Sequence, residues 1–369
     1  MIPRVAAAAL ALASVALGPA SAAAFCQTTD LPQRSRPGTA CEELCNCPVR
    51  GLDEDPVCTT SRGERALRIR WSRPCLEWAL NEDGSLDVPF EDVRALVARA
   101  FDQWTGVDCG GRTPGFEVME APPVSCDAPA FDQGGRNANV IAFATGTEWG
   151  DAGYDSGALA VTEAWFGTTS GEIFDADLII NEGTEPGVDE NGQPVFDEDG
   201  NRLRNRSFLF VDCPATGCAF VGDPRTHDLG NVITHELGHF FGLGHTPDDE
   251  EATMWACAAP DFVGAGQFRV EVDKRELSAD DEAGICAVYA EGALGDACDF
   301  APRGGRADAC VPGLTTSAGG GCRCDAGGNP APTLLAAGLL AIFVRRRRRA
   351  RGLAGASVLR DVQKRASRG

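Results

Sequence analysis

The sequence predicts an α+β fold, in which several strands form a sheet that a small number of helices cover. Short runs in which apolar and polar residues alternate predict strands, as at residues 66–71. Residues 90–104 repeat their apolar side chains at spacings of three and four, which predicts an amphipathic helix that needs a sheet to cover. A hydrophobic content of 43% in 369 residues is enough for a sizeable core, in one large domain or two ordinary ones.

The expected elements follow one another in a simple order. The strand at 66–71 continues at 75–80 and ends in a turn at 81–85, after which Pro89 opens the helix. Further strands are expected at residues 115–120, 139–144, 158–166 and 174–181. Residues 184–206 are polar and contain Asn-Gly and Asp-Gly turns, so we expect a hairpin insertion there. Its acidic residues lack the spacing of an EF-hand calcium loop.

Three of the four histidines in the chain lie within the eleven residues from His235 to His245. On a helix, His235 and His239 project from one face about a turn apart and can bind one metal ion. Gly242 can adopt the left-handed conformation that ends a helix, so that the chain turns back and delivers His245 as a third ligand. Three protein ligands and one open position are typical of a catalytic zinc site. The alternative is a buried apolar helix whose histidines only pack.

This run reads HExxHxxGxxH, and the pattern resembles that of the metzincin zinc metalloproteases. The resemblance implies a zincin-like fold with a twisted mixed sheet, an active-site helix and a small C-terminal subdomain that ends in a helix. It also implies that Glu236 is the general base for the water that attacks a peptide carbonyl. In such proteins an extended substrate pairs with the edge of the sheet, and we expect residues 158–166 to form that edge strand.

Two further segments resemble the matrixin branch of the metzincins, so we expect the protease domain to span residues 65–291. Met254 follows the third histidine by nine residues and resembles the Met-turn that underlies the zinc site. Residues 277–289 resemble the terminal helix, with Ser278 as a plausible N-cap. In matrixins the acidic pair that matches Asp280 and Asp281 ties this helix to the Met-turn. We expect the specificity pocket to be walled by residues 255–268.

One zinc ion is the expected cofactor, and calcium is a second candidate. Matrixins also hold a structural zinc mainly through histidines, but only His227 remains here, and we expect it to be a capping or surface residue. Asp175 and Asp177 alternate with apolar neighbours, so both point to one face and could hold calcium. The alternative is a pair of solvent-facing carboxylates.

Sixteen cysteines are too many for a typical cytosolic enzyme of this size and indicate an oxidising compartment. Residues 25–64 are dense in cysteine, and we expect a small disulfide-stapled extension there, with a zinc knuckle at 45–47 as the alternative. A small-loop disulfide between Cys213 and Cys218 is plausible. Cys257 and Cys286 could join the Met-turn region to the terminal helix, although connectivity cannot be deduced from sequence alone.

Both ends of the chain resemble sorting signals. Residues 1–24 have a basic start, an apolar run and small-residue cleavage sites, which predicts a signal peptide; the alternative is an N-terminal membrane anchor. After a Gly-rich linker at 292–321, residues 322–350 contain a cysteine motif, a short apolar stretch and five arginines. They resemble the myxobacterial-type C-terminal sorting tag (MYXO-CTERM), with an ordinary tail anchor as the alternative, and a basic tail follows at 351–369.

The charge distribution bears on the partners of the chain. Residues 25–324 carry 22 basic and 52 acidic side chains, a net charge of −30, which argues against nucleic acid as a partner. The resemblance to matrixins, together with the two terminal signals, implies a monomeric zinc endopeptidase that acts on protein or peptide substrates outside the cell or on its surface, with membrane contact through the C-terminal tag. The rival hypotheses are a catalytically silent surface adhesin or binding module on the same scaffold and a zinc hydrolase of non-peptide amides.

Overall fold

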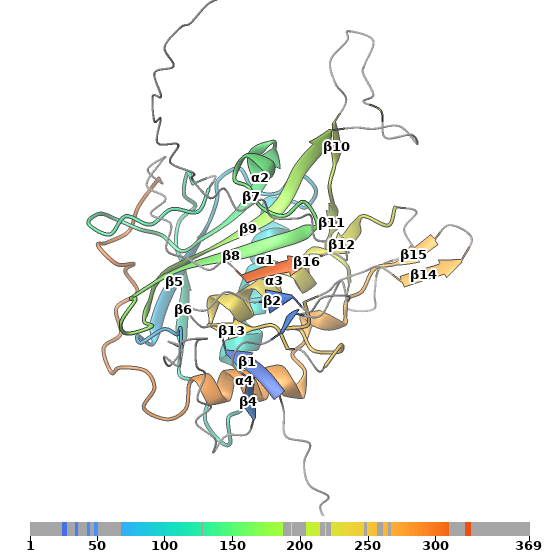
Figure 1. The fold of residues 1–369 in the computed structure, drawn as a ribbon. Helices are drawn as coiled ribbons and strands as arrows, with labels where there is room; N and C mark the ends of the chain where they lie inside the picture. Colours follow the sequence, from blue (N-terminus) through green and yellow to red (C-terminus); the bar gives the residue numbers. More distant parts are fainter. Residues whose placement is uncertain are drawn as a thin grey trace, which may run out of the picture. The chain divides into compact units, whose positions relative to one another are not determined.

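A computed structural model gives the fold of the chain (Figure 1). The residues that the structure describes are 24–27, 34–35, 43–44, 48–50, 68–126, 128–186, 193, 204–214, 218, 223–246, 249–256, 261–264, 267–309 and 322–325. The predicted signal peptide before residue 24 and the tag and tail beyond residue 325 lie outside these ranges. The predicted wall of the specificity pocket lies partly outside them.

A mixed sheet organises the molecule, in the strand order β16-β8-β9-β7-β5-β6. Its strands are β5 (Cys75–Leu80), β6 (Glu117–Glu120), β7 (Val140–Gly146), β8 (Ala158–Phe166), β9 (Ile173–Pro186) and β16 (Cys322–Asp325). The four strands from β9 to β6 are parallel to one another, whereas β8 runs antiparallel to β9. This arrangement, with few helices, confirms the predicted α+β class and its twisted mixed sheet.

The two faces of the sheet pack differently because successive side chains of a strand point to opposite sides. Alternate residues such as Leu178 and Ile180 face a large core, into which α1 (Phe90–Thr105) and α3 (Leu229–Phe240) also pack. The residue between them, Ile179, faces a second and smaller apolar cluster that includes Trp149 of the short helix α2 (Glu148–Asp151). The helix α3 therefore lies against the face of the sheet that carries the larger core.

Three aromatic hydrogen bonds fix the position of α3 within that core. The indole of Trp104, on α1, donates to the carbonyl of Thr234, with 2.8 Å between nitrogen and oxygen. The indole of Trp71 donates to the carbonyl of Phe240 and the hydroxyl of Tyr289 to that of Phe241, at 2.8 and 2.7 Å. Carbonyls at the end of a helix lack intrahelical partners, so the donors from Trp71 and Tyr289 satisfy groups at Phe240 and Phe241 that would otherwise be costly to bury.

The remaining elements surround this core. They are β1 (Ala24–Gln27), β2 (Arg34–Ser35), β3 (Glu43–Leu44), β4 (Pro48–Arg50), β10 (Arg204–Arg206), β11 (Leu209–Val211), β12 (Thr226–Asp228), β13 (Leu243–Gly244), β14 (Asp261–Gly264), β15 (Gln267–Arg269), the 3-10 helix η1 (Asp273–Arg275) and α4 (Ala279–Val288). β10 pairs with the end of β9, which confirms the predicted hairpin at its base. β1 pairs with β13, so the Cys-rich extension reaches the strand directly before His245.

Three expectations about the fold need correction. The strand predicted at 66–71 does not form a regular strand in its described part, where isolated bridges, such as the one from Arg70 to Glu172, take its place. The strand at 158–166 does form, as β8, but it is not the bare sheet edge that we expected. The backbone of β16 pairs along its outer side, antiparallel and with Cys322 opposite Thr162. The third correction concerns Cys286, which bonds to Cys109 and not to Cys257.

The segment after α4 also differs from the linker that we expected. Cys298 bonds to Cys75 of β5, and Arg306 forms an ion pair with the buried carboxylate of Glu77. Residues 292–309, which we expected to be part of a linker, are therefore attached to the sheet. The small loop closed by Cys213 and Cys218 is confirmed. Among the described residues, none of the helices is both long enough and apolar enough to cross a membrane, and the apolar stretch of the predicted tag lies outside them.

Candidate metal centre

The helix α3 begins and ends at residues suited to those positions. Asp228 is its N-cap and accepts a hydrogen bond from the backbone N–H of Asn231 at 2.8 Å. Gly242 follows the helix with φ of 86°, in the left-handed region that glycine adopts without strain. A Cβ at Gly242 would also lie 2.5 Å from the carbonyl oxygen of Ile69. The chain can therefore reverse at this point and bring His245 back beside the helix.

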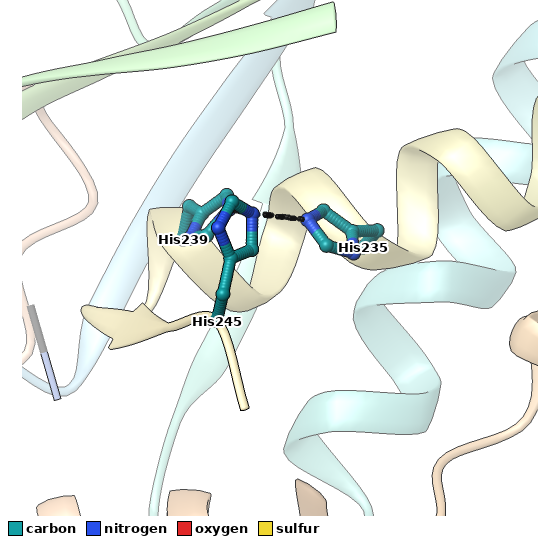
Figure 2. Close-up of side chains that lie close together, drawn as sticks. All are labelled: His235, His239 and His245. Atoms are coloured by element: carbon teal, nitrogen blue, oxygen red, sulfur yellow. Dashed lines mark hydrogen bonds between the residues drawn. The ribbon is translucent and has the colours of Figure 1, made fainter. Parts of the chain in front are cut away.

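Three imidazole rings converge at that reversal. Figure 2 shows His235 and His239 on α3 and His245 on the segment that follows it, with the rings facing one another. The three Nε2 atoms form a triangle, because each pair is separated by 3.1 Å. All three side chains are buried, with exposed fractions of 2–4%. Among the described residues, these three form a cluster whose nitrogens could share one metal ion.

The hydrogen bonds of two of these rings decide where their protons lie. Nδ1 of His235 contacts the carbonyl of Thr253 at 2.5 Å, and Nδ1 of His239 contacts that of Leu243 at 2.8 Å. A carbonyl only accepts, so each Nδ1 carries the proton and each Nε2 presents a lone pair. Burial lowers the pKa of both imidazoles well below the ordinary value, and the neighbouring histidines lower it further. Both rings are therefore neutral at neutral pH, the form that binds metals.

The triangle fits a zinc ion. The neutral rings of His235 and His239, whose Nε2 lone pairs lie 3.1 Å apart, repel one another unless a cation lies between them. A tetrahedral zinc with Zn–N distances of about 2.0–2.1 Å separates its nitrogen ligands by about 3.3–3.4 Å. The observed spacing is close to that value, and the donor set leaves a fourth position open. The residues present therefore match a three-histidine zinc site.

Glu236 is placed beside these ligands and is completely buried. It follows His235 on α3, and the hydroxyl of Thr162 on β8 donates to its Oε2 at 2.6 Å. A short O–H···O⁻ bond of this kind is typical of an ionised acceptor. Sequence reasoning missed Thr162, because it lies 74 residues from Glu236 and carries no motif. Only the pairing of strands and the packing of α3 against β8 bring the two together.

Met254 lies beneath the helix that carries the site. A Cβ on Gly238 of α3 would overlap the sulfur of Met254, so the glycine allows the methionine to pack directly against the helix. Asp281 accepts hydrogen bonds from the backbone N–H groups of Thr253 and Met254, at 2.8 and 3.0 Å. The first turn of α4 thereby holds the segment that also supplies the Thr253 carbonyl to His235.

The start of α4 explains why Asp281 is so placed. Ser278 is confirmed as the N-cap, and Asp281 in turn accepts from the N–H of Ser278, which forms a capping box. The neighbouring Asp280 is also buried in this first turn and donates its N–H to the hydroxyl of Ser278 at 3.2 Å. The two acidic residues therefore begin the helix, and Asp281 binds the segment around Met254.

Asp175 and Asp177 lie on β9, away from the histidines, and are both completely buried rather than solvent-facing. The carboxylate of Asp177 accepts hydrogen bonds from the backbone N–H groups of Val140 and Ala130, so it has a structural role. Burial raises its pKa to about 8, and burial together with Asp177 raises that of Asp175 well above the ordinary value. No third carboxylate, histidine or cysteine joins the pair within the described residues, so nothing there supports calcium, which takes six to eight oxygen ligands.

His227 is neither a cap nor a surface residue, so that expectation was wrong. It is buried in β12, with its ring edge-on to Phe208 at 5.5 Å between centroids. Burial lowers its pKa to about 4, so it is a neutral core histidine at neutral pH. The neighbouring Asp228 provides the cap, and Arg275 pairs with this aspartate. Aspartate strongly prefers the N-cap position, and this preference could have identified Asp228 as the cap from the sequence.

Comparison with known proteins agrees with this geometry. The family model described as matrixin matches residues 141–290, the part of the chain from β7 to the end of α4. The metalloendoproteinase 1-MMP of Arabidopsis thaliana is 26% identical over 221 residues, which is 60% of this chain. The match covers 44% of that relative, so the chain corresponds to less than half of its length. The three histidines, Glu236 and Met254 all fall inside the segment that the family model matches.

Proposed function

The chain carries a matrixin-like metzincin domain, and from this premise we propose that it is a zinc-dependent endopeptidase that hydrolyses peptide bonds of extracellular proteins. The observation that supports the proposal most strongly is the triangle of three buried imidazole nitrogens with a buried carboxylate beside it. A purely structural zinc site would close the fourth position with a protein ligand, and no such ligand belongs to the cluster among the described residues.

Each residue of the site then has one task. His235, His239 and His245 would hold zinc, which when bound supplies a Lewis acid and lowers the pKa of a water molecule toward neutrality. Glu236 would accept a proton from the attacking water and pass it to the leaving amine. The carbonyls of Thr253 and Leu243 keep two of the imidazoles in the tautomer that binds metal.

The first experiment tests whether zinc and peptide cleavage belong together. The purified full chain is incubated with a mixed protein substrate, with and without a zinc chelator, and new peptide termini are identified by mass spectrometry. We expect cleavage that the chelator stops and that added zinc restores, because the three histidines are the metal ligands. A zinc-loaded protein that cleaves nothing would contradict the proposal and favour a silent binding module. Hydrolysis of small amides alone would favour an amidase.

The strand β8 offers the backbone on which a substrate would lie. It passes beside α3, and the hydroxyl of its residue Thr162 reaches Glu236. An extended peptide that pairs with a sheet edge gains main-chain hydrogen bonds, with side-chain pockets adding selectivity. In this chain β16 already pairs with the outer side of β8, opposite that same threonine. We propose that a substrate strand must take the place of β16, so that residues 322–325 restrain activity.

Weakening the β16 pairing should therefore raise activity. Proline cannot donate a backbone hydrogen bond and is disfavoured inside paired strands, so Arg323→Pro should disturb the pairing with Val161. We expect kcat/KM for a protein substrate to rise several-fold. The control is Arg323→Ala, which keeps the backbone donor and should leave kcat/KM close to that of the unmodified chain. Equal values for all three proteins would show that β16 does not compete with substrate.

We propose that the chain works outside the cytoplasm. Cys75–Cys298, Cys109–Cys286 and Cys213–Cys218 are disulfides, and such bonds form and persist in oxidising compartments. The predicted signal peptide at 1–24 and the predicted sorting tag at 322–350 would provide export and surface attachment. Their membrane-directed parts lie outside the described residues, so this part of the proposal rests on the sequence and the disulfides.

A further inference from the structure

We infer that Thr162 is the positioning residue for the Glu236 carboxylate, so that one side chain of β8 orients the proton-accepting group. This inference rests on the proposed function, because it assigns a role within the same site. The contact is between two elements far apart in sequence, β8 and α3. Both side chains are buried, with exposed fractions of 2% for Thr162 and 0% for Glu236.

The geometry favours the carboxylate as the acceptor of the Thr162 proton. The hydroxyl oxygen lies 2.6 Å from Oε2 of Glu236 and 3.1 Å from its main-chain carbonyl oxygen. A hydroxyl has one proton to donate, and hydrogen bonds to a charged acceptor are shorter and about twice as strong as neutral ones. The main-chain carbonyl also lies within α3, where the N–H four residues later is its normal partner. The shorter contact is therefore the one that stabilises the site.

The donor is held more rigidly than the acceptor. Threonine is branched at Cβ and has a restricted χ1, and Thr162 sits in a paired strand opposite Leu178 of β9. A glutamate side chain rotates about three bonds, and its carboxylate group rotates readily about the last one. A fixed hydroxyl on Oε2 limits this rotation, so Oε1 keeps one orientation. Positioning of this kind contributes to catalysis because small misplacements of a reacting group lower the rate strongly.

Two substitutions separate the hydroxyl from the shape of the side chain. Thr162→Val keeps the branched shape and removes the donor, whereas Thr162→Ser keeps the donor and removes a methyl group. We expect Thr162→Val to lower kcat by about tenfold with KM within about twofold of the wild-type value. Thr162→Ser should recover most of the lost kcat. Zinc content, measured by atomic absorption, should stay unchanged in both variants because Thr162 is not a ligand.

A control variant tests whether the loss of a hydroxyl elsewhere in the domain slows the enzyme. Thr105 on α1 donates its hydroxyl to the carbonyl of Phe101 at 2.9 Å and does not touch the site. Thr105→Val removes a hydroxyl that makes a neutral hydrogen bond in the same domain. We expect its kcat to remain at the wild-type value. An equal loss of kcat in Thr105→Val and Thr162→Val would overturn the positioning role.

A second measurement tests the contact without any turnover. In zinc-free protein with its disulfides intact, the unfolding midpoint in denaturant is compared for Thr162→Val, Glu236→Ala and the double variant. Thr162→Val removes the hydroxyl that donates to this buried carboxylate, so we expect it to lower the midpoint clearly when Glu236 is present. The shift should be much smaller in the Glu236→Ala background. Equal shifts in both backgrounds would show that the two side chains are not coupled and would overturn the inference.

The outcomes also separate this inference from the proposed function. If the wild-type protein with bound zinc cleaves nothing, the proposed function fails, and the positioning role that rests on it fails as well. If the wild-type protein cleaves and Thr162→Val retains its kcat, only the inference is overturned. A raised KM with unchanged kcat would likewise overturn it, because Thr162 would then act on the substrate strand and not on Glu236.

Discussion

Glu236→Gln is expected to keep its zinc and to lose turnover. The amide has nearly the shape of the carboxylate and can still accept the hydrogen bond that Thr162 donates, so the fold and the three histidines should stay in place. It cannot take a proton from water at neutral pH. A general base contributes about 10²–10⁴-fold to a rate, so kcat should fall by at least that range. The measurements are steady-state cleavage of a peptide and the zinc content of the same sample.

A second glutamate provides the control for this substitution. Glu163 is the next residue on β8, so its side chain points to the other side of the strand, where Tyr154 donates to it at 2.9 Å. Glu163→Gln keeps an acceptor for that hydroxyl, and we expect its kcat to stay close to the wild-type value. Full activity of Glu236→Gln would contradict the role of Glu236. Loss of zinc from Glu236→Gln would show that the substitution acts through the metal site.

His239→Ala is expected to lose both zinc and activity. Its Nε2 is one corner of the triangle and lies 3.1 Å from each of the other two nitrogens. Two imidazoles alone bind zinc far more weakly than three, so the purified variant should contain much less than about one zinc per chain. Ligand binding stabilises a folded protein, so added zinc should raise the thermal midpoint of the wild-type protein and not that of the variant.

The remaining histidine supplies the matched control. His227 is buried in β12 against Phe208 and is not part of the metal cluster. His227→Gln should retain the zinc content and the thermal shift on zinc addition, even if its packing costs some stability. A normal zinc content in His239→Ala would show that the ligand assignment is wrong. Loss of zinc in His227→Gln would place a ligand outside the three histidines.

Local sequence patterns predicted the site because most of its parts are close together in the chain. The spacing of His235 and His239 places both on one face of a helix, and Gly242 permits the reversal that returns His245. The N-cap of α4 at Ser278 was predicted for the same reason, since a cap depends on residues within one turn. Sequence patterns likewise predicted α1 and the positions of the five strands from β5 to β9.

Contacts between distant segments were predicted poorly. Cys257 was considered as a partner of Cys286 with the connectivity left open, and the bond in fact crosses 177 residues to Cys109. Residues 292–309 have the glycine content of a linker, yet Cys298 and Arg306 attach them to β5. The spacing of residues contains no information about which surfaces meet after folding, so disulfide partners and long-range ion pairs could not be deduced.

The sequence by itself determined the three candidate metal ligands, because three of four histidines lie in eleven residues and a helix with a glycine turn can bring them together. Only the tertiary structure decided what surrounds them. It places Thr162 against Glu236, Met254 beneath Gly238 and β16 along β8. The physical reason is that helical geometry relates residues one turn apart, whereas strand register and the packing of a helix on a sheet depend on the whole core.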